Sequence, residues 1–406
     1  MLDPLQLSII KATVPLLESG GEALTTHFYR VLLAEHPEVR PLFNPAHQAS
    51  GTQPRALANA VLMYARHIDR LEKLGDLPSR IVQKHVSLRI QAEHYPVVGA
   101  CLLRAIREVL GAEIATDEVL EAWAAAYQQL ADLLISAEAR VYAEQAQAPG
   151  GWSGARAFRI THKTPESAEI TSFTLVPADG GAPMDFLPGQ FIGLRLVIDG
   201  VEQRRNYSLS AAPDGRHYRI SVKREPGGRV SNHLHDQLQP GDVLELFPPA
   251  GDFTLRPGTR PVVLISGGVG ITPTLALLQA ALPTGRRIRF LHCARNAHVH
   301  AFRAWVDEQA QRHPQLQRFY CHAEAAPGTP PPDAVGRLDR EQLARWLPRE
   351  RDVDVYLLGP KPFMASVLRS LGELGVPRHQ CHVEFFGPTE ELTAPPAPPV
   401  AVVAAA

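Results

Sequence analysis

The sequence predicts three consecutive domains: an all-helical domain, an antiparallel β-barrel and an α/β domain with a parallel sheet. Apolar residues first recur at three- and four-residue spacing, up to about residue 147. They then alternate with polar residues from about 155 to 258, and finally form continuous runs between helical segments up to about 388. A length of 406 residues agrees with two or three domains.

Helical periodicity is clearest on two faces within residues 1–147. One face comprises Leu57, Val61, Leu62, Ala65, Ile68 and Leu71, and the other comprises Leu120, Trp123, Tyr127, Leu130 and Leu134. Residues 148–154 contain a proline and three glycines, so we expect a linker there.

Strand patterns follow in residues 155–258. Residues 218–223 alternate apolar and polar side chains, as in a half-buried strand, and 168–176, 189–198 and 243–247 are similar. Several short strands separated by glycine and proline turns predict an antiparallel barrel.

Residues 259–388 change to a βαβ rhythm. Residues 262–265 form a continuous apolar run, which is typical of a parallel strand buried on both faces. We expect a helix at 274–282, a strand at 288–293, a helix at 300–311, a strand at 355–358 and a helix after Pro362. The tail, 389–406, is rich in alanine and proline, and we expect it to be disordered.

Composition and charge exclude several classes of protein. The net charge of −1 gives no sign of a nucleic-acid or membrane-surface partner. No signal peptide and no bilayer-spanning apolar segment is evident, so we expect no stable membrane insertion. The four cysteines are scattered without a CxxC pair, which favours free thiols in a reducing cytoplasm.

A glycine turn opens the α/β domain. Gly267-Gly268-Val269-Gly270-Ile271-Thr272-Pro273 follows the apolar strand and leads into a helix. Glycines let the backbone approach a pyrophosphate, and a helix N-terminus supplies free N–H groups and a positive dipole end. Thr272 could cap this helix, with Pro273 at its first position. A purely structural turn is the alternative interpretation.

Five motifs together resemble ferredoxin-reductase-like proteins, in that family's order. They are Pro188-Gly189-Gln190-Phe191, Arg205-Asn206-Tyr207-Ser208, Val222-Lys223-Arg224-Glu225, Gly227-Gly228-Arg229-Val230-Ser231 and Leu358-Gly359-Pro360. The resemblance implies an FAD site at Phe191, Arg205, Asn206, Tyr207, Ser208, Lys223, Glu225, Gly228, Val230 and Ser231. It also implies a nicotinamide dinucleotide site at Gly268, Val269, Gly270, Ile271, Thr272 and Pro273.

The same resemblance implies individual roles. Arg205 would pair with flavin phosphate, which its bidentate fork suits. Tyr207 would lie along the isoalloxazine or ribityl chain, and Ser208 would hydrogen-bond near flavin N5. Backbone amides after Gly227-Gly228 would hold the pyrophosphate. Phe191 replaces the family's usual tyrosine, and Leu358 replaces its usual cysteine.

A second constellation lies in the helical domain. Tyr29, Phe43, Gln53, Leu57, Lys84, His85, Tyr95 and Glu138, in this order, resemble the globin domain of flavohaemoglobins. The resemblance covers about residues 1–388 and includes residues 11–17, 150–152 and the final motif of Glu384, Phe385, Phe386, Gly387 and Pro388. Phe385 stands where that family more usually has cysteine. The last four of these residues are included among the expected cofactor contacts.

The flavohaemoglobin resemblance implies a haem b site. His85 would ligate iron, with its other ring nitrogen donating to Glu138 and Tyr95 bonded to the same carboxylate. Tyr29, assisted by Gln53, would donate to the bound oxygen substrate. Phe43 would contact the porphyrin, Leu57 would restrict the pocket, and Lys84 would stabilise a haem propionate or the flavin phosphate region. The alternative interpretations are that Phe43 and Leu57 only pack in the core and that Gln53 and Glu138 lie on the surface.

The resemblance therefore implies an NAD(P)H-dependent nitric oxide dioxygenase that uses haem, FAD, dioxygen and nitric oxide, and works as a monomer. Two alternatives stay open: a reductase of alkyl or lipid hydroperoxides, and a globin that binds oxygen or nitric oxide and is kept ferrous by its reductase. Arg295 could meet a 2′-phosphate or be a solvated surface residue, so NADH and NADPH stay open too.

Overall fold

The computed structural model describes residues 2–387, which form two compact units. The first unit runs to Pro257 and includes Thr272–Thr284 with Phe386 and Gly387; the second comprises Gly258–Ile271 and Gly285–Phe385. Pro388 and the tail at 389–406, for which disorder is expected, lie outside the described residues.

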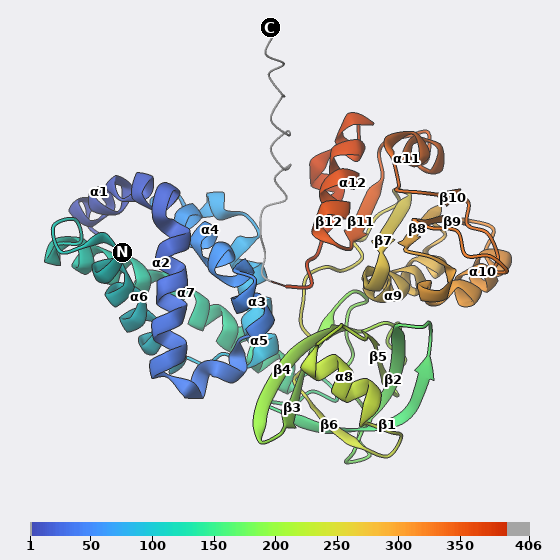
Figure 1. Cartoon of the computed structure of the whole chain (residues 1–406), viewed down its shortest axis with the longest axis horizontal. Coiled ribbons are helices and arrows are strands. Elements are labelled where there is room, and N and C mark those ends of the chain that lie inside the picture. Colours follow the sequence, from blue (N-terminus) through green and yellow to red (C-terminus); the bar gives the residue numbers. More distant parts are fainter. Residues whose placement is uncertain (1, 388–406) are drawn as a thin grey trace, which may run out of the picture. The chain divides into compact units, whose positions relative to one another are not determined.

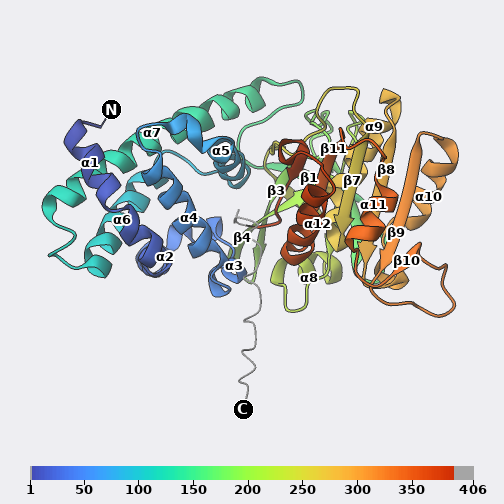
Figure 2. The ribbon, with the colours of Figure 1, turned by 90° about the horizontal axis from the view of Figure 1, so that it is seen from above.

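Helices fill the first part of the chain, as predicted (Figure 2). They are α1 (Pro4–Ala12), α2 (Val14–Glu35), α3 (Pro45–Ala49), α4 (Thr52–Arg66), α5 (Leu77–Leu88), α6 (His94–Leu110) and α7 (Asp117–Gln147), with 3-10 turns at Pro37–Leu42 and Leu71–Leu74. Asp3 and Gln6 form a capping box at the start of α1, and the Thr116 hydroxyl caps α7. The chain leaves α4 before Ile68 and Leu71, yet both side chains still pack in the helical core.

The first unit also holds a six-stranded antiparallel sheet. Its strands are β1 (Arg156–Pro165), β2 (Ile170–Pro177), β3 (Phe191–Ile198), β4 (Val201–Ser208), β5 (Tyr218–Lys223) and β6 (Val243–Leu246), in the order β4-β3-β6-β1-β2-β5. A bridge between Leu209 and Ile220 joins the end of β4 to β5, the strand at the other edge. Helix α8 (Arg229–Asp236) packs Val230 and Leu234 onto the core of this sheet.

The second sheet is parallel throughout, as the continuous apolar runs predict. Its strands are β7 (Val262–Gly267), β8 (Ile288–Ala294), β9 (Leu316–His322), β10 (Ala334–Val335), β11 (Asp354–Leu358) and β12 (Cys381–Val383), in the order β10-β9-β8-β7-β11-β12 (Figure 1). The helices are α9 (Ile271–Ala281), α10 (Arg303–Arg312), α11 (Arg340–Trp346) and α12 (Lys361–Glu373).

Two predicted helix starts are wrong. Helix α9 begins at Ile271, because Gly268–Gly270 wind as a 3-10 turn that continues directly into it. Thr272 is therefore the second helical residue rather than the cap, and Pro273 is the third rather than the first. Helix α10 begins at Arg303, since Phe302 takes a left-handed backbone conformation with φ 61°.

None of the helices in the described part combines the length and the apolar character that crossing a bilayer requires.

Candidate functional site

Three side chains from α5, α6 and α7 meet around one carboxylate. His85 Nδ1 lies 2.7 Å from Glu138 Oε1, and the Tyr95 hydroxyl donates to the same oxygen at 2.6 Å. Glu138 is 2% exposed, so these two partners, rather than bulk water, hydrogen-bond to its carboxyl group. Burial, followed by the hydrogen bond to Glu138, raises the pKa of Tyr95 and keeps its hydroxyl protonated. The structure brings these three predicted residues together, and the roles assigned to them stay predictions.

The two ring nitrogens of His85 differ in their hydrogen-bond partners. Its Nδ1 is occupied by Glu138 and Tyr95, and Nε2 has no partner among residues 2–387. The side chain is 33% exposed although its carboxylate partner is buried. A carboxylate on one nitrogen fixes the tautomer and makes the other nitrogen a better metal ligand. This arrangement would suit His85 Nε2 as a ligand of a haem iron.

A second buried hydroxyl lies on α2. Tyr29 is 6% exposed, and its ring packs edge-on against Phe43 with centroids 5.6 Å apart. Burial raises the pKa of Tyr29, and a hydrogen bond from the Gln53 side chain partly offsets this. Leu57, one turn after Gln53 on α4, packs against the same core cluster. The predicted group of Tyr29, Phe43, Gln53 and Leu57 is thus assembled around a neutral phenol.

Lys84, next to His85 on α5, contacts the last described residue. Its ammonium donates to the Gly387 carbonyl oxygen at 2.5 Å. Phe386 is half exposed, and Phe385 is buried in the core of the second unit. The predicted cofactor contacts of Phe385, Phe386 and Gly387 are not tested by these contacts, and Pro388 lies beyond the described residues.

The flavin motif on β4 holds a partly buried cation. Arg205 donates to the Arg204 carbonyl oxygen at 2.7 Å and to Gln203 Oε1 at 3.2 Å, and no carboxylate among residues 2–387 pairs with it. Burial lowers the pKa of its guanidinium and raises that of the neighbouring Tyr207 phenol. A desolvated guanidinium without an acidic partner is suited to a phosphate. Ser208 is buried at the end of the same strand.

The turn before α8 offers backbone donors. Gly227 has a left-handed φ of 70°, and Gly228 precedes the helix without any side-chain cap on its first amides. A side chain at Gly228 would collide with Ser231 Oγ. The amides at the start of α8, including Val230 and Ser231, are therefore open to an anion such as a pyrophosphate.

Other predicted flavin contacts have protein partners. Lys223 and Glu225 form an ion pair at 2.9 Å. Asn206 donates to Ser87 Oγ on α5 at 2.9 Å. Phe191 is buried in a cluster with Val86 and Tyr95. The sequence did not reveal that β3 and β4 pack so closely on α5, where a side chain at Gly193 would collide with the Ser87 carbonyl.

The glycine turn of the second unit is tightly packed. A Cβ at Gly270 would collide with the Leu358 carbonyl oxygen, and one at Gly267 would lie 3.1 Å from the Phe363 ring. Gly268 has a left-handed φ of 56°. These positions require glycine for close approach and backbone conformation, which the nucleotide interpretation of residues 267–273 also needs.

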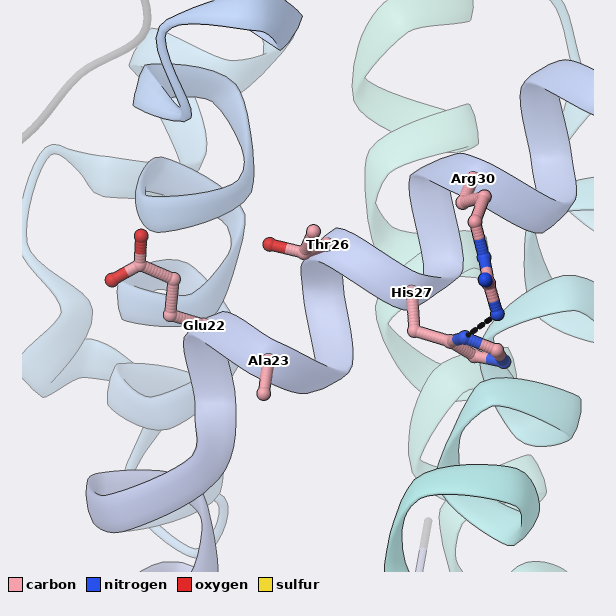
Figure 3. Close-up of a pocket in the computed structure, with 5 residues that line it drawn as sticks. All are labelled: Glu22, Ala23, Thr26, His27 and Arg30. Carbon is pink, nitrogen blue, oxygen red and sulfur yellow. Dashed lines mark hydrogen bonds between the residues drawn. The ribbon is translucent and has the colours of Figure 1, made fainter.

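A shallow hollow on the outer face of α2 is unrelated to these groups. It is lined by Glu22, Ala23, Thr26, His27 and Arg30, which all belong to one helix (Figure 3). Arg30 donates to His27 Nδ1 at 2.7 Å. None of the predicted site residues lines it.

Family models match three parts of the chain in succession. A globin model matches residues 26–134, an oxidoreductase FAD-binding domain matches 157–255, and an oxidoreductase NAD-binding domain matches 264–369. A flavohemoprotein of Pseudomonas aeruginosa is 66% identical over 97% of this chain and all of its own length, and one of Pseudomonas putida is 65% identical with the same coverage. The chain belongs to the flavohemoprotein family. It is an oxidoreductase with a globin domain, an FAD-binding domain and an NAD-binding domain, which confirms the predicted fold classes and cofactor classes.

Solved structures of other flavohemoproteins also match the fold of this chain. A flavohemoglobin from Malassezia yamatoensis, described with bound FAD and heme, matches 95% of this chain and all of its own, with a TM-score of 0.84 and 28% identity. The FAD/NAD-binding domain of a nitric oxide dioxygenase from Vibrio cholerae matches 56% of this chain and 97% of its own, with a TM-score of 0.53 and 38% identity. The individual site residues and the exact domain boundaries stay predictions.

Proposed function

We propose that this flavohemoprotein is a nitric oxide dioxygenase that oxidises NADH or NADPH and converts nitric oxide and dioxygen to nitrate. The observation that carries the proposal is the imidazole of His85, held by Glu138 and Tyr95 with its Nε2 available to a haem iron. The name of the Vibrio cholerae protein supports the choice of reaction. The balanced reaction takes two nitric oxide, two dioxygen and one NAD(P)H to two nitrate, NAD(P)⁺ and a proton.

Glu138 and Tyr95 control how strongly His85 would donate electrons to a bound iron. His85 would hold haem, which would supply the iron for the reaction of dioxygen with nitric oxide, and FAD would supply the hydride and single-electron chemistry that links NAD(P)H to it. Glu138 accepts a hydrogen bond from His85 Nδ1, which increases the electron donation of Nε2. Tyr95 donates to the same carboxylate oxygen and fixes its position.

Tyr29 is the proposed hydrogen-bond donor to the oxygen substrate. Its pKa is raised by burial, so the hydroxyl keeps its proton at every physiological pH. A donated hydrogen bond in a desolvated site stabilises negative charge that develops on an oxygen substrate. Gln53 orients the hydroxyl, while Phe43 and Leu57 pack in the same cluster and exclude water.

The reductase residues have positioning roles. Arg205 would bind a flavin phosphate, and the amides of Val230 and Ser231 would bind the FAD pyrophosphate. Ser208 would hydrogen-bond near the flavin atom that receives hydride. The helix start at Gly270 and Ile271 would bind the dinucleotide. NADH and NADPH stay open, because Arg295 is exposed and can meet solvent or a 2′-phosphate.

The test compares His85→Ala with His36→Ala in the full-length protein. His36 is a matched control, because it is 31% exposed and its Nδ1 lies 3.0 Å from Glu38 Oε1. We expect a haem Soret band, NADH-dependent reduction of flavin and then haem, and nitric oxide consumption in the wild type and His36→Ala. His85→Ala should retain flavin reduction and lose both haem reduction and nitric oxide consumption.

The reaction products separate this proposal from its competitors. Nitrate formed at two per NADH supports dioxygenation. Consumption of NADH only with alkyl hydroperoxides would indicate a peroxide reductase, and gas binding without continued NADH consumption would indicate a binding globin. Either result would contradict the proposal. The cytoplasmic location and the monomeric state stay predictions, to be tested by fractionation and by sedimentation.

A further inference from the structure

Two cysteines of the second unit lie side by side on neighbouring strands. Cys293 on β8 is in direct register with Cys321 on β9. In-register residues of neighbouring strands lie about 4.8 Å apart with their side chains on the same face. This separation is within the range of about 4.4–6.8 Å between Cα atoms that a disulfide accepts. The two thiols are hydrogen-bonded to each other.

The two thiols differ in exposure. Cys293 is half-buried, whereas Cys321 is 1% exposed in the cluster that packs against α11 and α12. The Cys321 thiol is oriented by a hydrogen bond to the Gly336 carbonyl oxygen at 3.4 Å. The hydrogen bond from Cys293 lowers the pKa of Cys321. The hydrogen bond to Cys321, followed by burial, raises the pKa of Cys293. The pair thus combines a half-buried thiol, which is protonated at neutral pH, with a fully buried thiol beside it.

The pair adjoins the glycine turn. Cys293 is also in register with Gly267, the last residue of β7. Directly after the two cysteines, the Ala323 amide donates to the Ala294 carbonyl oxygen at 3.0 Å and the Glu324 amide donates to the Arg295 carbonyl oxygen at 2.8 Å. Ligands of parallel α/β sheets bind at these carboxyl ends of the strands. A change at the cysteines would therefore alter the backbone beside the proposed dinucleotide site.

We propose that Cys293 and Cys321 form a redox-modification site, in which a small disulfide such as oxidised glutathione converts the dithiol to an intrachain disulfide that weakens NADH binding. The effect on NADH rests on the proposed nucleotide site at Gly267–Pro273, while the disulfide itself does not.

The chemistry is thiol–disulfide exchange. The Cys293 thiol, whose pKa is raised, first loses its proton to solvent, so the reaction should become faster as the pH rises. The thiolate then attacks one sulfur of oxidised glutathione, whose S–S bond breaks, and one glutathione leaves as a thiolate that takes up a proton. The Cys321 thiolate then attacks the Cys293 sulfur and displaces the second glutathione. Two protein thiols lose two electrons and two protons, and oxidised glutathione gains both to become two reduced glutathiones.

The Cα separation suits a disulfide, but the bridge needs Cβ atoms about 3.5–4.5 Å apart, which is closer than the spacing of about 4.8 Å between strands. A disulfide would therefore strain the ladder between β8 and β9, which the hydrogen bonds at Ala294 and Arg295 hold at its normal spacing. Strained disulfides are more easily reduced than structural ones, so the bond should be reversible. The strain is relieved at the strand ends, where the nucleotide would bind.

The experiment treats the full-length protein, with its cofactors, with oxidised glutathione and then blocks the remaining thiols. Peptide mass spectrometry should find the Cys293–Cys321 disulfide, and flavin reduction by limiting NADH without oxygen should become about tenfold slower, equivalent to about 1.4 kcal/mol. Dithiothreitol should restore the rate. At a fixed ratio of oxidised to reduced glutathione, bound NAD⁺ should lower the fraction of disulfide at equilibrium, because the linkage between the two sites is reciprocal.

Matched variants separate this pair from the other cysteines. Cys293→Ser should bind NADH and lose its sensitivity to oxidised glutathione, whereas Cys101→Ser and Cys381→Ser should remain sensitive. Both control residues are buried, and burial raises the pKa of Cys101 and brings that of Cys381 to about 11. Cys321→Ser tests the buried partner. If this variant does not fold, the reversible response of the wild-type protein still tests the proposal.

Three results would overturn the proposal: no disulfide between these cysteines, a disulfide that leaves flavin reduction unchanged, or a Cys293→Ser protein that stays sensitive. Failure of the proposed function has a different signature. Flavin reduction by NADH would then be normal and nitric oxide would not be consumed, and the disulfide result would stand by itself.

Discussion

The two buried tyrosines of the helical domain differ in what their hydroxyl groups contact. Tyr95 donates to the carboxylate of Glu138 at 2.6 Å, whereas Tyr29 has the neutral amide of Gln53 as its partner. Burial raises the pKa of both phenols, so both keep their protons. A strong charged acceptor commits Tyr95 to a structural hydrogen bond, while the weaker partner leaves Tyr29 able to donate to a substrate. Similar burial therefore supports two different roles.

The largest expected effect is from Tyr29→Phe. Removal of a donor to developing negative charge should lower the rate of nitric oxide consumption by roughly 100- to 1000-fold. Flavin reduction by NADH should be unchanged. The control is Tyr64→Phe, since Tyr64 is 4% exposed and its hydroxyl donates to the Ala126 carbonyl oxygen at 2.9 Å. Equal losses in both variants would remove the distinction between a substrate donor and a core hydroxyl.

Glu138→Gln should have the next largest effect. It keeps the shape of the side chain and removes the charge that His85 and Tyr95 share, so activity or haem affinity should fall by about 10- to 100-fold. The haem reduction potential should rise, because a neutral partner makes the imidazole a weaker donor. Glu108→Gln is the control, as it changes another histidine–glutamate pair, with His27, at the surface. An unchanged potential would contradict the role given to Glu138.

Tyr95→Phe should lower turnover by less than Glu138→Gln does. Glu138 keeps its hydrogen bond with His85 but loses one donor, which corresponds to about 1 kcal/mol and to a fall of about fivefold in turnover. The urea midpoint of the helical circular dichroism signal should fall as well. Tyr142→Phe, which removes a hydroxyl that donates to the Ile90 carbonyl oxygen, provides the comparison. If Tyr95→Phe impaired turnover as severely as Tyr29→Phe, the two hydroxyls would not have the separate roles assigned to them.

The smallest effect is expected from Gln53→Leu. Tyr29 would keep its burial and lose its orienting partner, so nitric oxide turnover should fall by about threefold. Dissociation of dioxygen from the reduced protein should become faster by a similar factor. Gln128→Leu, on the exposed side of α7 and paired with Asp132, should change neither rate. A larger loss than that of Tyr29→Phe would mean that Gln53 itself is the donor.

Local sequence patterns were sufficient to predict the order of the helices and strands. Period-two alternation at residues 218–223 corresponds to β5, and the apolar run at 262–265 lies within β7. The errors lie at helix ends. The glycine turn was expected to end with a cap at Thr272, but the chain winds continuously from Gly268 into α9. Glycine permits several backbone conformations, so the packing of Leu358 and Phe363 around the turn decides which one forms.

The sequence by itself determined the fold classes, the motifs of the reductase and the residues expected around a haem. The fold classes follow from side-chain periodicity, which local physical chemistry controls, whereas the reductase motifs and the haem residues follow from the family resemblance. Only the tertiary structure decided the other side-chain contacts of the site residues. It placed Asn206 against Ser87, left Arg205 without a carboxylate partner among residues 2–387, and brought Cys293 beside Cys321. Strand register and helix packing fix such distances, and neither is encoded in the spacing of residues along the chain.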